Sequence, residues 1–510
     1  MSLFGRLWGW GAAGLALLPL IGIALLLMSP PPNPFGLPQA SWNELIQSHG
    51  LSVLWVRSMA LATVVTLGSS LYGLILAMIG HRAQFRAVRL LHWFSLLPLA
   101  MPSYILAAVL RQQLNGQGGF AVAAVSLIVV CTPYTQLVVG SALVNGSASE
   151  EEAARLMGAT PWRIFRQILW PKLRTAMAFS MLIAFLYAIS DFGAVAMLNV
   201  PVLTWRLYES VQNQDLLQAA LLGCFLILST LPVLLLAHRL RGKARPSSVS
   251  QVRQPSRVPL SKPWVAVAST LQLLPVFVGV LLPLIELSQW VLNATDPMTN
   301  PLGALWDSLL LSVIGTLLTL VLAWGAAWLT GTGNSTDQKW LPQAVYLSSA
   351  LPGVLLAFGL LMVTLRLTKG IEGGYAMVLG SGVLLFLGYA MRFLAEAYGP
   401  ILSGIQQMNP RLREGAILLG ASPSRWFSQV AFPILKPSIL SAAIIIMLAI
   451  LKELPVTLIL GSATGRRTLA FRIWDRYNEA IWADAGSHAL LLCGLALILT
   501  AFSLRRHQHA

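Results

Sequence analysis

Two acidic residues stand inside long apolar stretches of this chain, where ionisable side chains are rare. Asp191 occurs in ISDFGAV and Glu453 in LKELPVT. Because a charged group in a bilayer is costly, such residues are candidates for function by default. Carboxylate oxygens suit a hard metal cation. The alternative is that Asp191 caps the end of a broken helix and Glu453 pairs with a neighbouring cation.

Other chemistry is not indicated. The three cysteines, Cys131, Cys224 and Cys493, lie in apolar runs without metal-ligand spacing, which favours buried free thiols. No G-x-x-x-x-G-K-[ST] phosphate-binding loop occurs in the sequence. We therefore expect no catalytic residue, no resident metal and no cofactor bound by this chain, and we expect that it is not an enzyme.

The elements that position the two acids are predicted from composition. Of 510 residues, 56% are hydrophobic and 10% are charged, against about 25% charged in soluble domains. A helix needs roughly 20 apolar residues to cross a bilayer. The sequence predicts an all-α polytopic membrane protein with about 12 transmembrane helices, near residues 8–28, 52–79, 91–111, 120–144, 176–199, 215–238, 264–288, 304–330, 343–367, 375–398, 438–462 and 484–504.

The basic residues predict an orientation. The net charge is +16, and most Lys and Arg lie in connections on the side of the amino terminus, including the linker 239–263. By the positive-inside rule both termini are cytoplasmic. The lipid bilayer then accounts for the basic excess, and nucleic acid is not an expected partner.

The chain is also a tandem duplication. Ser58 and Pro102 recur as Ser308 and Pro352, at an offset of 250. Further along, other pairs recur at an offset of 262, Asp191 and Glu453 among them. The predicted organisation is a six-helix repeat over 1–238, a cytoplasmic linker over 239–263 and a second six-helix repeat over 264–510. Copies with an even number of spans share one orientation, so a pseudo-twofold axis would run along the membrane normal. If the spans around the two acids line the central pathway, the acids would face each other across this axis.

A loop motif occurs once in each repeat. Gly158 and Gly420 are placed to end one short helix, and Thr160 and Ser422, each followed by proline, are placed to start another. The result is a rigid elbow suited to docking on another protein. A helix lying on the lipid headgroups is the alternative, which two copies with the same spacing make less attractive.

This spacing resembles the EAA loop of ABC importer permeases, the signature that engages ATP-binding subunits. In the second copy Gly415 replaces the first alanine, and Val430 replaces isoleucine. The resemblance assigns ATPase coupling to Glu152, Ala153, Ala154, Gly158, Ile168, Pro171, Glu414, Ala416, Gly420, Val430 and Pro433.

The resemblance covers nearly the whole chain, which is similar to fused ferric iron importer permeases. This similarity implies the type I ABC importer fold. It implies a permease of the bacterial cytoplasmic (inner) membrane that translocates ferric iron, with Asp191 and Glu453 in the substrate pathway. The implied partners are two copies of an ATP-binding subunit, which bind the ATP, and a periplasmic or lipid-anchored solute-binding protein. The alternatives are an ABC permease for thiamine or another small solute, and a twelve-span secondary transporter.

Two arginines mark the predicted outer face. Arg206 and Arg472 occupy equivalent positions between aromatic and aliphatic residues, in TWRLY and AFRIW. They could receive an acidic surface of the solute-binding protein. The alternative is that the arginines and their aromatic neighbours anchor the chain in the lipid headgroups.

Overall fold

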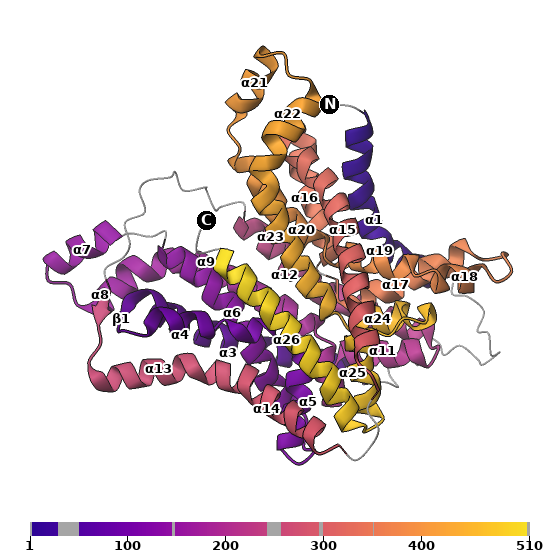
Figure 1. Ribbon diagram of the computed structural model, residues 1–510, viewed down its shortest axis with the longest axis horizontal. Helices are drawn as coiled ribbons and strands as arrows, with labels where there is room; N and C mark the ends of the chain where they lie inside the picture. Colours follow the sequence, from indigo (N-terminus) through magenta and orange to yellow (C-terminus); the bar gives the residue numbers. More distant parts are fainter. Residues whose placement is uncertain are drawn as a thin grey trace. The chain divides into compact units, whose positions relative to one another are not determined.

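The computed structural model describes residues 3–28, 50–144, 148–241, 257–294, 299–349 and 351–506, and helices dominate it (Figure 1). Among these residues, nine helices are long and apolar enough to cross a membrane, two bent helix pairs are each a broken span or a re-entrant loop, and Gly353–Leu367 is a shorter apolar helix. The described residues thus hold nine to eleven candidate spans, against about twelve predicted, and each of these elements overlaps a predicted run. The all-α polytopic fold is therefore confirmed.

The bends in the two helix pairs have local causes. One bends by 93° between Ala100 and Ser103, at Pro102, and the other by 60° at Gly382, where φ is +77°. Proline cannot donate a backbone hydrogen bond and holds the residue before it in an extended conformation. Glycine adopts positive φ without steric cost.

The helices form two compact units. The amino-terminal unit lies within 40–206 and 224–293. Its elements are α3 (Leu51–Arg82), β1 (Ala83–Gln84), α4 (Val88–Phe94), η1 (Leu97–Ala100), α5 (Ser103–Gln113), α6 (Phe120–Val144), α7 (Ala148–Leu156), α8 (Pro161–Ile164), η2 (Phe165–Leu169), α9 (Trp170–Ser190), α10 (Gly193–Met197), β2 (Val258–Pro259), α13 (Lys262–Val276), η3 (Phe277–Leu281) and α14 (Leu282–Leu292).

The carboxy-terminal unit lies within 1–39, 207–223 and 294–510. Helices α11 (Leu203–Gln212) and α12 (Leu216–Arg241) are divided between the units. The other elements of this unit are α1 (Leu3–Met28), α15 (Leu302–Thr332), α16 (Ser335–Ser349), α17 (Gly353–Leu367), α18 (Gly374–Gly380), α19 (Val383–Arg392), α20 (Leu394–Gln407), α21 (Pro410–Leu418), α22 (Pro423–Trp426), η4 (Phe427–Ala431), α23 (Phe432–Leu451), α24 (Pro455–Leu460), η5 (Ser462–Thr464), α25 (Leu469–Asn478) and α26 (Trp482–Arg506).

The first helix of each sequence repeat belongs to the unit built mainly from the other repeat. Helix α1 crosses α17 so closely that a Cβ on Gly22 would lie 2.1 Å from the Gly359 carbonyl oxygen. Small residues permit such close crossings between membrane helices. Helix α13 joins α3, where the Tyr72 hydroxyl donates to the Leu271 carbonyl at 2.6 Å. The compact units thus contain different sets of helices from the repeats 1–238 and 264–510. The division into these two repeats stays a prediction.

Part of the predicted linker can be placed. Helix α12 continues to Arg241, and β2 forms a two-residue parallel pairing with β1, in which Ala83 is opposite Val258. The linker residues 242–256 lie outside the described residues.

The duplication extends to individual hydrogen bonds. Ser58 Oγ accepts from the Leu203 amide at 2.9 Å, and Ser308 Oγ accepts from the Leu469 amide at 2.7 Å. In each unit a buried serine thereby satisfies the first amide of the helix α11 or α25, which has no partner within its own helix.

Candidate functional site

The two predicted elbows have matching backbones. Gly158 has φ +79° and Gly420 has φ +73°, the left-handed conformation that ends a helix. The residue after each glycine donates its amide to the carbonyl of the second motif alanine, Ala159 to Ala154 and Ala421 to Ala416, both at 3.0 Å. These bonds fix the bend.

The second arm of each elbow begins with a side-chain cap. Thr160 Oγ1 accepts from the Arg163 amide at 3.4 Å, and Ser422 Oγ accepts from the Arg425 amide at 3.3 Å. In the second elbow, Asn409 also caps α21, because its Oδ1 accepts from the Arg411 amide at 3.0 Å. These caps confirm the predicted starts of the second arms.

A π-helical turn then joins each second arm to a long helix. These turns are Phe165–Leu169 and Phe427–Ala431, and a proline follows two residues after each of them, Pro171 and Pro433. Proline has no amide hydrogen and its ring clashes with the carbonyl four residues back. A wider turn accommodates both conditions, so the arm and the long helix form one continuous rod.

Each elbow exposes two adjacent apolar side chains immediately before its glycine. Leu156 and Met157 are 89% and 82% exposed, and Leu418 and Leu419 are 87% and 89% exposed. The two pairs are 262 residues apart, at the same point of the duplicated motif. We call them the elbow-tip pairs. Large apolar residues this exposed, at matching positions, are typical of a docking surface.

The residues assigned by the EAA resemblance lie on both sides of these tips in the sequence, and their exposure varies. Trp162 is exposed in the first elbow, and its equivalent, Ser424, is polar. The assigned residues are exposed at Ala153, Gly158, Pro171, Glu414, Gly420 and Pro433, half-buried at Glu152, Ile168, Ala416 and Val430, and buried at Ala154.

A buried ion pair anchors the first elbow. The Arg82 guanidinium donates to both carboxylate oxygens of Glu151, at 2.6 and 2.7 Å. Sequence reasoning selected the neighbouring Glu152 and missed this pair, whose members are 69 residues apart. The sequence feature that came nearest to indicating this pair was Arg82, an arginine at the end of the first long span of its unit.

The two intramembrane acids play equivalent local roles. Helix α9 stops at Asp191, whose Oδ2 accepts from the Ala194 amide at 2.9 Å. Glu453 Oε1 accepts from the Val456 amide at 3.4 Å. Each carboxylate therefore caps a short helix, α10 or α24, beyond the break in a long one. The acids lie in different units, so their facing one another stays a prediction.

The residues that face the two acids differ in size, and this difference offsets the difference in length between the acids. Ser103 Oγ donates to Asp191 Oδ1 at 2.6 Å. At the equivalent position of the second repeat is Gly353, where an added Cβ would lie 2.8 Å from Glu453 Oε1. The longer acid thus faces the residue without a side chain, and the shorter acid faces serine.

The two predicted outer arginines lie on α11 and α25. Arg206 is exposed, and Arg472 is half-buried. Beside Arg472, the Arg467 guanidinium lies 4.4 Å from the centre of the Phe471 ring. The assignment of Arg206 and Arg472 to binding-protein docking stays a prediction.

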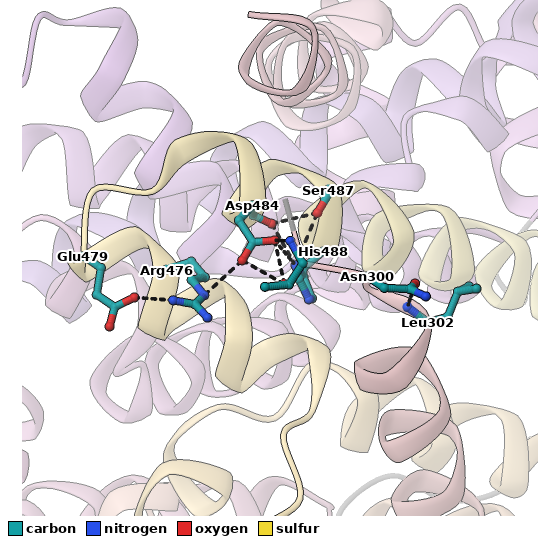
Figure 2. Close-up of polar contacts among 8 residues, drawn as sticks. Asn300, Leu302, Arg476, Glu479, Asp484, Ser487 and His488 are labelled. Carbon is teal, nitrogen blue, oxygen red and sulfur yellow. Dashed lines mark hydrogen bonds and ion pairs between the residues drawn. The ribbon is translucent and has the colours of Figure 1, made fainter. Parts of the chain in front are cut away.

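A charged network next to α25 was not predicted (Figure 2). Asp484, 1% exposed, accepts from the Thr299 amide at 3.0 Å and from its hydroxyl, and pairs with Arg476 Nε at 3.0 Å. Arg476 also pairs with Glu479 at 2.6 Å. The first repeat has a neutral bond here, from Ser210 to Gln218 at 3.1 Å. This network ties the start of α26 to α25 and to the segment before α15.

Among the described residues, no group of three or more His, Cys, Asp or Glu could hold a metal ion. The fold and the site together define a class: a polytopic helical membrane protein with a duplicated fold, in which each copy joins an exposed elbow to a broken membrane helix. The sequence matches the family of binding-protein-dependent transport system inner membrane components over residues 69–246 and again over 333–510. The chain belongs to this family.

Similar proteins of known description are also transport permeases. An Fe(3+)-transport system permease protein of Haemophilus influenzae is 23% identical over 470 residues, covering 88% of this chain and 89% of that protein. A ferric transport system permease protein of Actinobacillus pleuropneumoniae is 22% identical, covering 88% and 70%. A putative 2-aminoethylphosphonate transport system permease protein of Salmonella typhimurium is 28% identical over 202 residues, covering 39% and 73%.

The elbow glycines give a first prediction. Nothing lies within 4 Å of a Cβ built on Gly158 or Gly420, so valine there would introduce only backbone strain, about 1–2 kcal/mol. Gly158→Val should accelerate hydrogen exchange of the Ala159 amide by about tenfold, since each 1.4 kcal/mol is a factor of ten. Gly158→Asn is the control, because asparagine tolerates positive φ. Equal exchange in both variants would contradict the prediction.

The acid-facing residues give a second prediction. Gly353→Ser should destabilise the protein by about 1–3 kcal/mol through overpacking against Glu453. Adding Glu453→Asp recreates the Ser103–Asp191 pair, so the double variant should recover much of the loss. Thermal unfolding of the purified protein in detergent measures both. Additive effects of the two substitutions would show that the pair does not compensate in this way.

Proposed function

We propose that this chain is the membrane-spanning subunit of an ABC importer that translocates ferric iron. A solute-binding protein delivers the iron on the outer face, and separate ATP-binding subunits drive transport from the cytoplasmic face. The matched elbow-tip pairs carry the proposal. They give two equivalent docking points on a duplicated fold, as two copies of one ATP-binding subunit require.

The long helices supply a mechanical link between elbow and pathway. The stretch from the second arm of the first elbow to the break before Asp191 is a single span, Pro161–Ser190. Its counterpart, Ser424–Leu451, runs to the break before Glu453. At 1.5 Å per residue each rod is about 40–45 Å long. A displacement of a docked elbow therefore reaches the capped break at the far end of its rod.

This link explains transport without covalent chemistry by this chain. ATP-driven closure of the partner subunits would bring the two elbows together, and the rods would tilt. The breaks capped by Asp191 and Glu453 would then switch the pathway between outward and inward access. A ligand-driven change of this kind needs a difference in affinity between the two states, which the ATP-binding subunits supply.

The iron assignment rests on two supports. The relatives that cover most of the chain are ferric transport permeases, and carboxylates suit a hard cation as cargo. A second substrate class, 2-aminoethylphosphonate, is favoured by the relative at 28% identity, although it covers less than half of this chain. No observation specifically favours thiamine or a secondary transporter.

The proposed placement is the inner membrane of a bacterium, with both termini in the cytoplasm. The distribution of basic residues supports this orientation. It puts both elbows on the ATP-containing side and Arg206 and Arg472 on the side of the binding protein, where an acidic partner surface would meet them.

The elbow-tip pairs give a third prediction. Replacing Leu156, Met157, Leu418 and Leu419 by glutamate should abolish co-purification with the ATP-binding subunit, by more than about 100-fold in affinity, since burying each apolar side chain is worth about 1.5–3 kcal/mol. The control is Ile371→Glu in the turn between α17 and α18, outside the predicted spans, because Ile371 is also exposed, at 62%. Undiminished co-purification of the fourfold variant would refute docking at these tips.

A fourth prediction concerns the cargo. The complete complex, reconstituted in vesicles with its binding protein, should take up ferric iron only when ATP is present. An excess of thiamine or 2-aminoethylphosphonate should not reduce this uptake. ATP-dependent uptake of either compound without uptake of iron would refute the iron assignment and leave the importer assignment in place.

A further inference from the structure

The two elbows differ in how they are held. The first elbow begins with α7, whose Glu151 side chain is 2% exposed and makes a bidentate ion pair with Arg82. Arg82 is the last residue of α3. The pair therefore joins the start of the elbow to the end of a long helix of the same unit.

Other contacts make this end of α3 a firm support. After the elbow, Leu169 and Leu173 pack on α3 and α6, in a buried cluster with Ala77, Val139 and Leu143. Beyond Arg82, β1 pairs with β2. Glu151 is thus fixed to a helix end that is itself held on two sides.

At the two positions equivalent to Arg82 and Glu151, the second repeat has no acid–base pair. Helix α15 ends at Thr332, the equivalent of Arg82, and Glu151 is replaced by Arg413. The Thr332 hydroxyl donates to the Trp328 carbonyl within α15 at 2.8 Å. The Glu150 equivalent is also uncharged, Leu412.

We propose that Arg82 and Glu151 are positioning residues that hold the first elbow rigid, so that the first elbow transmits the ATP-driven movement more tightly than the second. This inference rests on the proposed function, because it concerns docking at the same elbows. The duplicated halves would accordingly differ in mechanical role while they share one fold.

Physical chemistry supports a positioning role. A bidentate arginine–carboxylate pair fixes both the distance and the relative orientation of its two groups. Removing one member leaves the other as a buried, uncompensated charge, which is strongly destabilising. By contrast, the neighbouring Lys172–Glu150 pair has side chains 41% and 59% exposed, and exposed pairs of this kind contribute little.

The first test needs only the full-length chain in detergent. Glu151→Gln should increase amide hydrogen exchange across residues 150–157 by more than about tenfold, because it breaks a buried pair. The matched control, Glu150→Gln, changes the adjacent, exposed carboxylate and should leave exchange within about twofold. If the two variants exchange alike, Arg82 and Glu151 do not hold the elbow and the inference fails.

The second test uses the complete reconstituted complex. Arg82→Glu and Glu151→Arg should each keep the ATP-binding subunit bound and reduce the solute transported per ATP hydrolysed by at least about fivefold, since both break a buried pair. The double variant R82E/E151R restores opposite charges and should recover most of this ratio. A merely structural role would lower assembly and hydrolysis together and leave the ratio unchanged.

These experiments distinguish a failure of the proposed function from a failure of the inference about the two elbows. If wild-type chain does not bind an ATP-binding subunit, the proposed function fails, whatever the exchange data show. If it binds and transports but both single variants keep the wild-type ratio, docking stands and the asymmetry between the elbows is refuted.

Discussion

A helix that crosses a bilayer can break only where some other group takes over the hydrogen bonds that its backbone gives up, because lipid offers none. In this protein two carboxylates meet that condition, one in each unit. Asp191 and Glu453 accept the amides at the start of α10 and α24. The breaks between α9 and α10 and between α23 and α24 depend on these caps, and any pathway function of the acids must operate from this capped arrangement.

The duplication shows which features the fold requires and which could diverge. Both copies keep the left-handed glycine of the elbow, the π-helical turn before proline and the serine that caps α11 or α25. Among the described residues, the two charged networks discussed above each occur in one repeat only. The Arg82–Glu151 pair belongs to the first repeat, and the Asp484 network belongs to the second. The features that satisfy backbone geometry and hydrogen bonding thus occur in both copies, while the ion pairs between residues far apart in the sequence differ.

Features with a local cause were predictable from the sequence. Gly158 and Gly420 adopt positive φ because a glycine before a capped, proline-led helix has few alternatives. Asp191 as a helix cap was one of the two interpretations, and the structure shows that role. The membrane spans followed from the length of the apolar runs, since bilayer thickness fixes that length.

Features that depend on distant partners were not predictable. Glu151 was passed over for Glu152 because its partner is on another helix, and only packing decides which of two adjacent acids is buried. The elbow-tip pairs were missed because apolar residues are usually placed inside. The grouping of α1 with α17 requires knowledge of how two glycines meet, at Gly22 and Gly359, which no local pattern contains.

That grouping sets an order for biosynthesis. Helix α1 leaves the ribosome well before α17, which it crosses at Gly22 and which begins only at Gly353. At about 5–20 residues per second, α1 waits tens of seconds in the membrane before its partner exists. A ribosome that stalls within the second half would leave a glycine-lined helix surface open to lipid or to other nascent chains. Fusion of the halves into one polypeptide ensures that the awaited helix arrives on the same chain.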